Sequence, residues 1–188
     1  MKRTTAVLTL VMLLTGCATP YTLIEPGRTA VGDLYTVESQ ISWSSTRTGK
    51  IELWTVDGNG LQALRFVNGL ADGETLFEGK RKDNKKMPTF RKNMTISEIM
   101  EFVVDSVALQ GLERVESAGL RPYKFGNTQG FRFELSYVSS KGLEGQGAVV
   151  GAVVRERLYL IVYSGTRAYY YPKHRDHVER IIGSIRMQ

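Results

Sequence analysis

The chain has 188 residues, 42% of them hydrophobic, which is enough apolar content for one globular domain with its own core. It contains one cysteine, so no internal disulfide can hold the fold together. The formal net charge of +6 is concentrated in one short segment, which excludes the broad basic surface of a nucleic-acid-binding domain.

The amino terminus has the form of a secretion signal. Lys2 and Arg3 precede an apolar run over 5–14 that is too short to span a bilayer. The run closes on Leu14-Thr15-Gly16-Cys17, which resembles the lipobox of bacterial lipoproteins. This resemblance implies that a signal peptide, 1–16, is removed and that Cys17 carries a lipid anchor.

The residue after the anchor indicates where the mature protein resides. In the lipoprotein pattern an aspartate there favours the inner membrane, whereas this chain has Ala18. By that resemblance we expect an anchor in the outer membrane, with the domain facing the periplasm. Pro20 and Pro26 predict that 17–30 is a tether and that a single domain occupies 31–188.

Runs of β-forming residues begin the domain, at 41–45, 51–56 and 61–67. Asp57-Gly58-Asn59-Gly60 joins the last two runs, which predicts a hairpin. Asp57 and Asn59 alternate as calcium ligands do, but the distal glutamate of a calcium loop is missing. We therefore predict a turn.

The segment 79–92 holds most of the excess positive charge. Its seven basic residues accompany a single acid and are Lys80, Arg81, Lys82, Lys85, Lys86, Arg91 and Lys92. Like charges repel and apolar residues are few, so we expect an exposed loop. Two roles stay open: contact with an anionic surface, such as lipid headgroups or acidic envelope polymers, and solubility alone.

Helical spacing follows the basic segment. Thr95 and Glu98 are spaced as a capping box and Gly111 is placed to end the helix, which predicts a helix over 95–110. Its apolar stripe consists of Ile96, Ile99, Met100, Val103 and Val107.

Extended structure returns from residue 112. In 131–137 every odd residue is apolar and every even one polar, which predicts a strand with one buried and one wet face. The runs 148–154 and 158–163 are apolar on both sides, as in the middle of a sheet. Arg155-Glu156-Arg157 is expected at their hairpin turn.

A second amphipathic helix closes the domain after Pro172, with a stripe of Val178, Ile181, Ile182 and Ile185. The order strands, helix, strands, helix predicts an α+β fold, a mainly antiparallel β-sheet with two amphipathic helices packed on it. We expect both helical stripes to face one common core.

The carboxy-terminal part resembles PsbP-like and DcrB-like proteins. The resemblance is carried by Leu158-Tyr159-Leu160-Ile161-Val162-Tyr163, by Tyr169-Tyr170-Tyr171 and by the helical segment 179–185. It implies a sandwich of sheet and helices. Members of that fold are mostly non-enzymatic binding or assembly factors, and some are bacterial lipoproteins.

The residues for nucleophilic or metal chemistry are sparse. His174 and His177 have no Gly-x-Ser-x-Gly nucleophile to serve. Asp176 or Glu179 would join the histidines at a metal only if further ligands completed the site, so we expect solvated histidines. Gly145-Gln146-Gly147 departs from the dinucleotide fingerprint and reads as the entry to a strand. No catalytic residue, cofactor or metal is predicted.

Two further groups leave alternatives open. Glu52, Asp57 and Glu134 are isolated acids that would form a glycosidase site only if two of them met in one cleft. Trp43, Trp54 and the tyrosines near the carboxy terminus suit either a ligand groove or the core, and the core is the commoner place for them.

The sequence favours a lipid-anchored, non-catalytic envelope protein that binds or helps to assemble another envelope component. The expected partners are the membrane, through the lipid on Cys17, and an envelope protein or polymer, with no nucleic acid. The alternatives are a hydrolase of cell-wall or glycan material that uses a carboxylate pair, and a purely structural lipoprotein.

Overall fold

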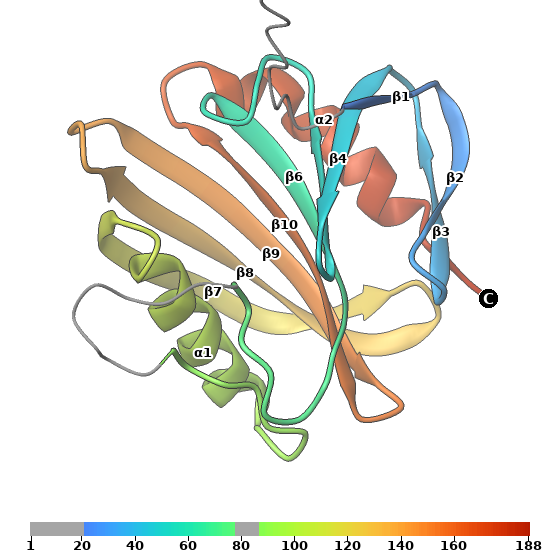
Figure 1. The fold of residues 1–188 in the computed structure, drawn as a ribbon, viewed down its shortest axis with the longest axis vertical. Helices are drawn as coiled ribbons and strands as arrows, with labels where there is room; N and C mark the ends of the chain where they lie inside the picture. The colour runs from blue at the N-terminus through green and yellow to red at the C-terminus, as the bar shows by residue number, and fades with distance from the viewer. Residues whose placement is uncertain (1–20, 78–86) are drawn as a thin grey trace, which may run out of the picture.

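The computed structural model describes residues 21–77 and 87–188 (Figure 1). The elements in chain order are β1 (Thr22–Ile24), β2 (Gly27–Val31), β3 (Tyr35–Ser39), β4 (Trp43–Thr48), β5 (Ile51–Thr55), β6 (Gln62–Leu70), α1 (Ile96–Ala108), β7 (Leu112–Phe125), β8 (Thr128–Ser139), β9 (Glu144–Val154), β10 (Arg157–Thr166), α2 (Tyr170–Gly183) and β11 (Arg186–Met187).

Eight strands form one sheet in the order β1-β4-β5-β6-β10-β9-β8-β7, and β11-β3-β2 form a smaller sheet beside it. Every pairing between these strands is antiparallel. The predicted α+β class, a mainly antiparallel sheet with two packed helices, is confirmed.

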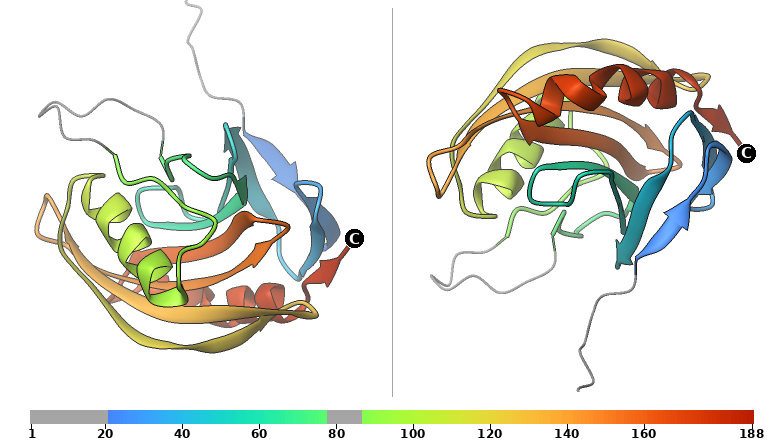
Figure 2. Two further views of the ribbon diagram at one scale, coloured as in Figure 1. Left: turned by 90° about the horizontal axis from the view of Figure 1, so that it is seen from below. Right: turned by 90° about the horizontal axis from the view of Figure 1, so that it is seen from above.

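The two helices lie on opposite faces of the large sheet (Figure 2). Val178, Ile181 and Ile182 of α2 pack into one buried cluster together with the small sheet. Ile99 and Val103 of α1 belong to a second cluster on the other face. The expectation of one common core is wrong, because the central strands are apolar on both faces and each face needs its own cover.

Both predicted hairpins are confirmed. β9 and β10 are neighbouring inner strands of the large sheet and turn at Arg155 and Glu156, whose φ angles of 49° and 61° suit a tight two-residue hairpin turn. Between β5 and β6 the amides of Leu61 and Gln62 donate to the carbonyl oxygen of Gly58, at 3.0 and 3.1 Å. The segment Asp57–Gly60 is therefore a turn.

The first helix begins as predicted, with a complete capping box between Thr95 and Glu98. Gly111 lies just beyond its end with φ 81°, the left-handed conformation expected there. The buried stripe differs at two positions: Ile96, the first helical residue, is 41% exposed, and Phe102 is buried. Neither described helix is long and apolar enough to cross a membrane.

The tether predicted over 17–30 is too long. Thr22–Ile24 pairs with β4 and Gly27–Val31 pairs with β3, so the fold already includes these residues. Val31, at the end of β2, is fully buried. The two strands are short and Pro26 lies between them, which hid their pattern in the sequence.

The face of β8 that was expected to be wet is covered by α2 at Arg132, while Ser136 on the same face is exposed as expected. Arg132 is only 5% exposed, and its Nη1 and Nη2 donate to Glu179 of α2 at 2.7 and 2.6 Å. Its Nε donates to Glu134 at 3.2 Å. The hydrogen bonds from Arg132 lower the pKa of Glu179, because they stabilise its ionised form. A bidentate ion pair therefore fixes α2 on the sheet.

We predict that Glu179→Gln lowers the free energy of unfolding by about 3 kcal/mol, because it removes the bidentate one of the two carboxylates that compensate a buried guanidinium. Glu38→Gln is the matched control, since Glu38 is 51% exposed in its pair with Arg28 and should lose less than about 1 kcal/mol. Urea unfolding monitored by circular dichroism measures both. Equal losses in the two variants would contradict the structural role of the Arg132 pair.

Candidate functional site

A groove of about 1240 Å³ opens on the face of the large sheet that carries α1. The helix contacts β7 and β8, at one edge of the sheet, and leaves the strands beyond them less covered. Strands β4, β5 and β6 line one side of the groove, and the end of α1 with the start of β7 lines the other. Side chains of β8 and β10, the start of β9, Tyr21, the turn residues 59–61 and residues 73–77 also line it.

Most of the groove surface is apolar. The apolar side chains inside it include Ile51, Leu53, Val67, Leu76, Leu135 and Val162. Three further lining residues, Tyr21, Leu61 and Leu143, are exposed by 51%, 38% and 55%. Large apolar side chains exposed beside a concave apolar surface are typical of binding sites.

Some charged side chains of the groove have a partner of opposite charge, and Arg65 has none among the described residues. Lys50 forms an ion pair with Glu74, and Glu144 lies 3.5 Å from Arg167. Arg65 is partly buried on β6 and has no carboxylate within ion-pair distance among the described residues. Burial lowers the pKa of its guanidinium, since the charged form is partly removed from water.

Neutral groups hold Arg65 in place. Its Nη1 donates to Ser164 Oγ of β10 at 3.0 Å and its Nη2 donates to Asn59 Oδ1 at 2.9 Å. Tyr137 of β8 lies near Arg65 and Ser164, and burial raises the pKa of its phenol. Opposite Tyr137, a Cβ on Gly145 would lie 2.1 Å from its ring, so only glycine fits there. The Gly145-Gln146-Gly147 segment is thus the predicted strand entry.

A second polar cluster joins α2 to the turn between β5 and β6. His174 is only 5% exposed, and its Nε2 lies 2.5 Å from Asp57 Oδ2. Lys173 Nζ donates to the other oxygen of Asp57 at 2.8 Å. The expectation of a solvated His174 is wrong, because helix α2 turns this position inward against Trp43.

The metal alternative gains no support from the histidines. His177 accepts a hydrogen bond from Arg180 Nη2 at 2.8 Å, and Glu179 binds Arg132. Across 21–77 and 87–188, no three His, Cys, Asp or Glu side chains are grouped as a metal would require.

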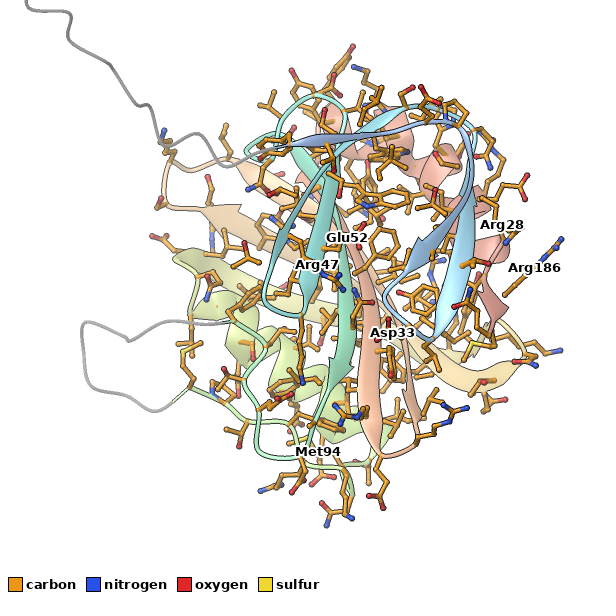
Figure 3. The ribbon with its side chains drawn as sticks, turned by 45° about the vertical axis from the view of Figure 1, so that its right-hand side comes forward. Arg28, Asp33, Arg47, Glu52, Met94 and Arg186 are labelled. Atoms are coloured by element: carbon orange, nitrogen blue, oxygen red, sulfur yellow. The ribbon has the colours of Figure 1, made fainter. Side chains whose placement is uncertain are left out.

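The three isolated acids lie on different elements and have different partners. Glu52 on β5 accepts a hydrogen bond from Trp54 Nε1 at 2.7 Å and lies opposite Arg47 of β4 (Figure 3). Asp57 binds Lys173 and His174, and Glu134 binds Arg132. Trp43 and Trp54, 1% and 0% exposed, are core residues and do not line the groove.

The structure tests little of the predicted basic loop. Lys80, Arg81, Lys82, Lys85 and Lys86 lie outside the described residues, as does Cys17. Arg91 and Lys92 are described and exposed, and both have acidic neighbours. Lys92 Nζ lies 3.0 Å from Glu156, and an Arg91 nitrogen lies 4.0 Å from Glu98. A role of the segment in binding an anionic surface stays a prediction.

Sequence reasoning missed the groove and Arg65. One signal was present: Arg65 is the only charged residue of the β-forming run 61–67, between Leu64 and Phe66. A charge at that place indicates a strand face that is not closed by core packing.

Comparison with known proteins shows similarity in fold. No family model matches the chain, and no curated protein matches it by sequence. The solution structure of cyanobacterial PsbP (CyanoP) from Synechocystis sp. PCC 6803 matches with a TM-score of 0.54 and 10% identity, over 95% of this chain and 99% of that one. The chain therefore has a PsbP-like fold, as its carboxy-terminal part indicated.

A second solved structure shares less of this geometry. LpqN of Mycobacterium tuberculosis, described as involved in cell envelope biogenesis, matches with a TM-score of 0.39 and 10% identity, over 93% of this chain and 87% of that one. Structural similarity at 10% identity shows the fold alone, so any ligand has to be inferred from the groove itself.

We predict that Asp57→Asn lowers the free energy of unfolding by about 2 kcal/mol at pH 7, because hydrogen bonds to the charged carboxylate are weakened. The hydrogen bond from Lys173, and after it the hydrogen bond from His174, holds the pKa of Asp57 below its ordinary 3.8. A carboxylate with a lowered pKa stabilises the fold fully above 3.8, and that contribution is lost as the pH falls through its folded pKa.

Urea unfolding from pH 7 to pH 2.5 measures this difference. The difference in the free energy of unfolding between wild type and Asp57→Asn should stay constant around neutral pH and decrease below pH 3.8. Asp176→Asn, on an exposed position of the same helix, is the control and should change stability by less than about 0.5 kcal/mol. A gap that is unchanged at the lowest pH would rule out ionised Asp57 as its source.

Proposed function

We propose that this chain is a lipid-anchored bacterial envelope protein whose domain is a non-catalytic binding module, with the groove beside α1 as its ligand site. The groove is the observation that carries the proposal: it is large, mostly apolar, and has exposed apolar side chains among its lining. An outer-membrane anchor facing the periplasm is the location that Cys17 and Ala18 favour.

The position of the expected anchor supports this function. Tyr21 lines the groove and lies four positions after Cys17 in the chain. A fully extended chain spans at most about 3.6 Å per residue, so lipid on Cys17 would hold the Tyr21 end of the groove within about 15 Å of the membrane surface. An apolar groove at that distance can receive an amphiphile from the membrane or from a neighbouring envelope component.

The anchor is tested at its cysteine. We predict that Cys17→Ser leaves an unprocessed precursor that takes up no labelled fatty acid, because both the lipid and the cleavage step depend on the thiol. Metabolic labelling followed by gel electrophoresis and mass measurement of the amino terminus checks this. Processing of the variant to the mature length would exclude lipidation at this residue.

The groove is tested by filling it. Thr46 lies half-buried on β4 and lines the groove, so Thr46→Trp should weaken binding of the neutral apolar probe N-phenyl-1-naphthylamine by about ten-fold, or about 1.4 kcal/mol. Thr29→Trp, a half-buried position on β2 outside the groove, is the matched control and should bind as wild type does. Fluorescence titration measures both, and equal affinities would place the ligand elsewhere.

A further inference from the structure

We infer that the groove holds a single-chain amphiphile with a carboxylate headgroup, and that Arg65 is the residue that binds this carboxylate. The inference rests on the proposed function of the groove and names the class of its ligand. It is carried by the juxtaposition of a partly buried guanidinium and an apolar lining on one face of the sheet.

The charge balance of the groove selects an anion. Among the described residues, the two carboxylates that line the groove, Glu74 and Glu144, already lie beside Lys50 and Arg167. Arg65 faces neutral partners instead, Ser164 and Asn59. In the described part of the chain the groove therefore has one positive charge that lacks a counter-charge, and a partly desolvated cation is the stronger attractor of an anion for that reason.

The hydrogen bonds of Arg65 leave room for a ligand. A guanidinium has five N–H donors, and two of these are given to Ser164 and Asn59. The acceptors of those two bonds lie on β10 and in the turn before β6, so they orient the planar group without neutralising it. The remaining donors can form the paired hydrogen bonds that arginine makes with a carboxylate.

A carboxylate fits this site better than a phosphate monoester. A carboxylate brings one negative charge, which a single guanidinium compensates. A phosphate monoester carries between one and two negative charges at neutral pH, and its second charge would enter a mostly apolar groove without a partner. Apolar residues such as Ile51, Leu53 and Val67 line the groove with Arg65 and provide the surface for the acyl chain.

The experiment uses residues 18–188, which contain every described element of the fold. Isothermal titration below the critical micelle concentration compares laurate with dodecanol, dodecylamine and dodecyl phosphate. Wild type should bind laurate at least about ten-fold tighter than each of the others. Decanoate, which is two methylenes shorter than laurate, should bind roughly ten-fold more weakly, because each buried methylene strengthens apolar binding.

Two variants identify the residue. Arg65→Met should bind laurate and dodecanol equally while keeping the wild-type affinity for dodecanol. Arg47→Met removes the same charge from an exposed position of β4 outside the groove and should keep the laurate preference. Arg65→Lys retains a cation and should retain part of that preference, which serves as the test if the methionine variant does not fold.

The outcomes separate the inference from the proposed function. If wild type binds neither laurate nor dodecanol, the groove does not bind amphiphiles and both proposals fail. If it binds the two equally, or if Arg65→Met keeps the preference for laurate, the groove function stands and the role of Arg65 is overturned. Binding of dodecyl phosphate as tightly as laurate overturns the carboxylate assignment.

Discussion

The constraint on which this structure depends is that its central strands are apolar on both faces. Side chains of β9 and β10 alternate between two buried clusters, with Val150 and Ile161 on one face and Val149 and Leu160 on the other. A sheet of this kind has no face that can be left to water. One face is closed by α2 and the small sheet, and the other is only partly closed by α1. The groove follows from this unequal cover.

Polar contacts fix the better-covered face. Arg132 reaches from β8 to Glu179 of α2, and Asp57 reaches from the turn between β5 and β6 to His174 of the same helix. An apolar stripe alone tolerates small shifts of a helix along a sheet, whereas directional bonds at two places on the helix do not. The helix therefore keeps one position, and the strands beneath it present a fixed surface to the groove on their opposite side.

The sequence pattern predicted the local elements, namely the hairpins and the first helix. Runs of β-forming and apolar residues with turn residues between them identified the hairpins, and the spacing of Thr95, Glu98 and Gly111 predicted the limits of α1 within two residues. Periodicity could not say which face of the sheet each helix covers, since Ile99 and Ile181 have equally apolar surroundings on opposite faces. For the same reason it took Arg132 and His174 for solvent-facing residues. Their partners, Glu179 and Asp57, are 47 and 117 positions away in the chain.

Arg65 differs from Arg132 because no carboxylate compensates its guanidinium among the described residues. Arg132, the other arginine drawn into the body of the sheet, has two carboxylates beside it, and this is how a folded chain ordinarily compensates a desolvated guanidinium. Arg65 has a hydroxyl and an amide oxygen, which orient the group but supply no charge. Its desolvation therefore costs free energy that the described residues do not recover. A ligand carboxylate would recover it, so the same arrangement that weakens the empty fold strengthens the complex.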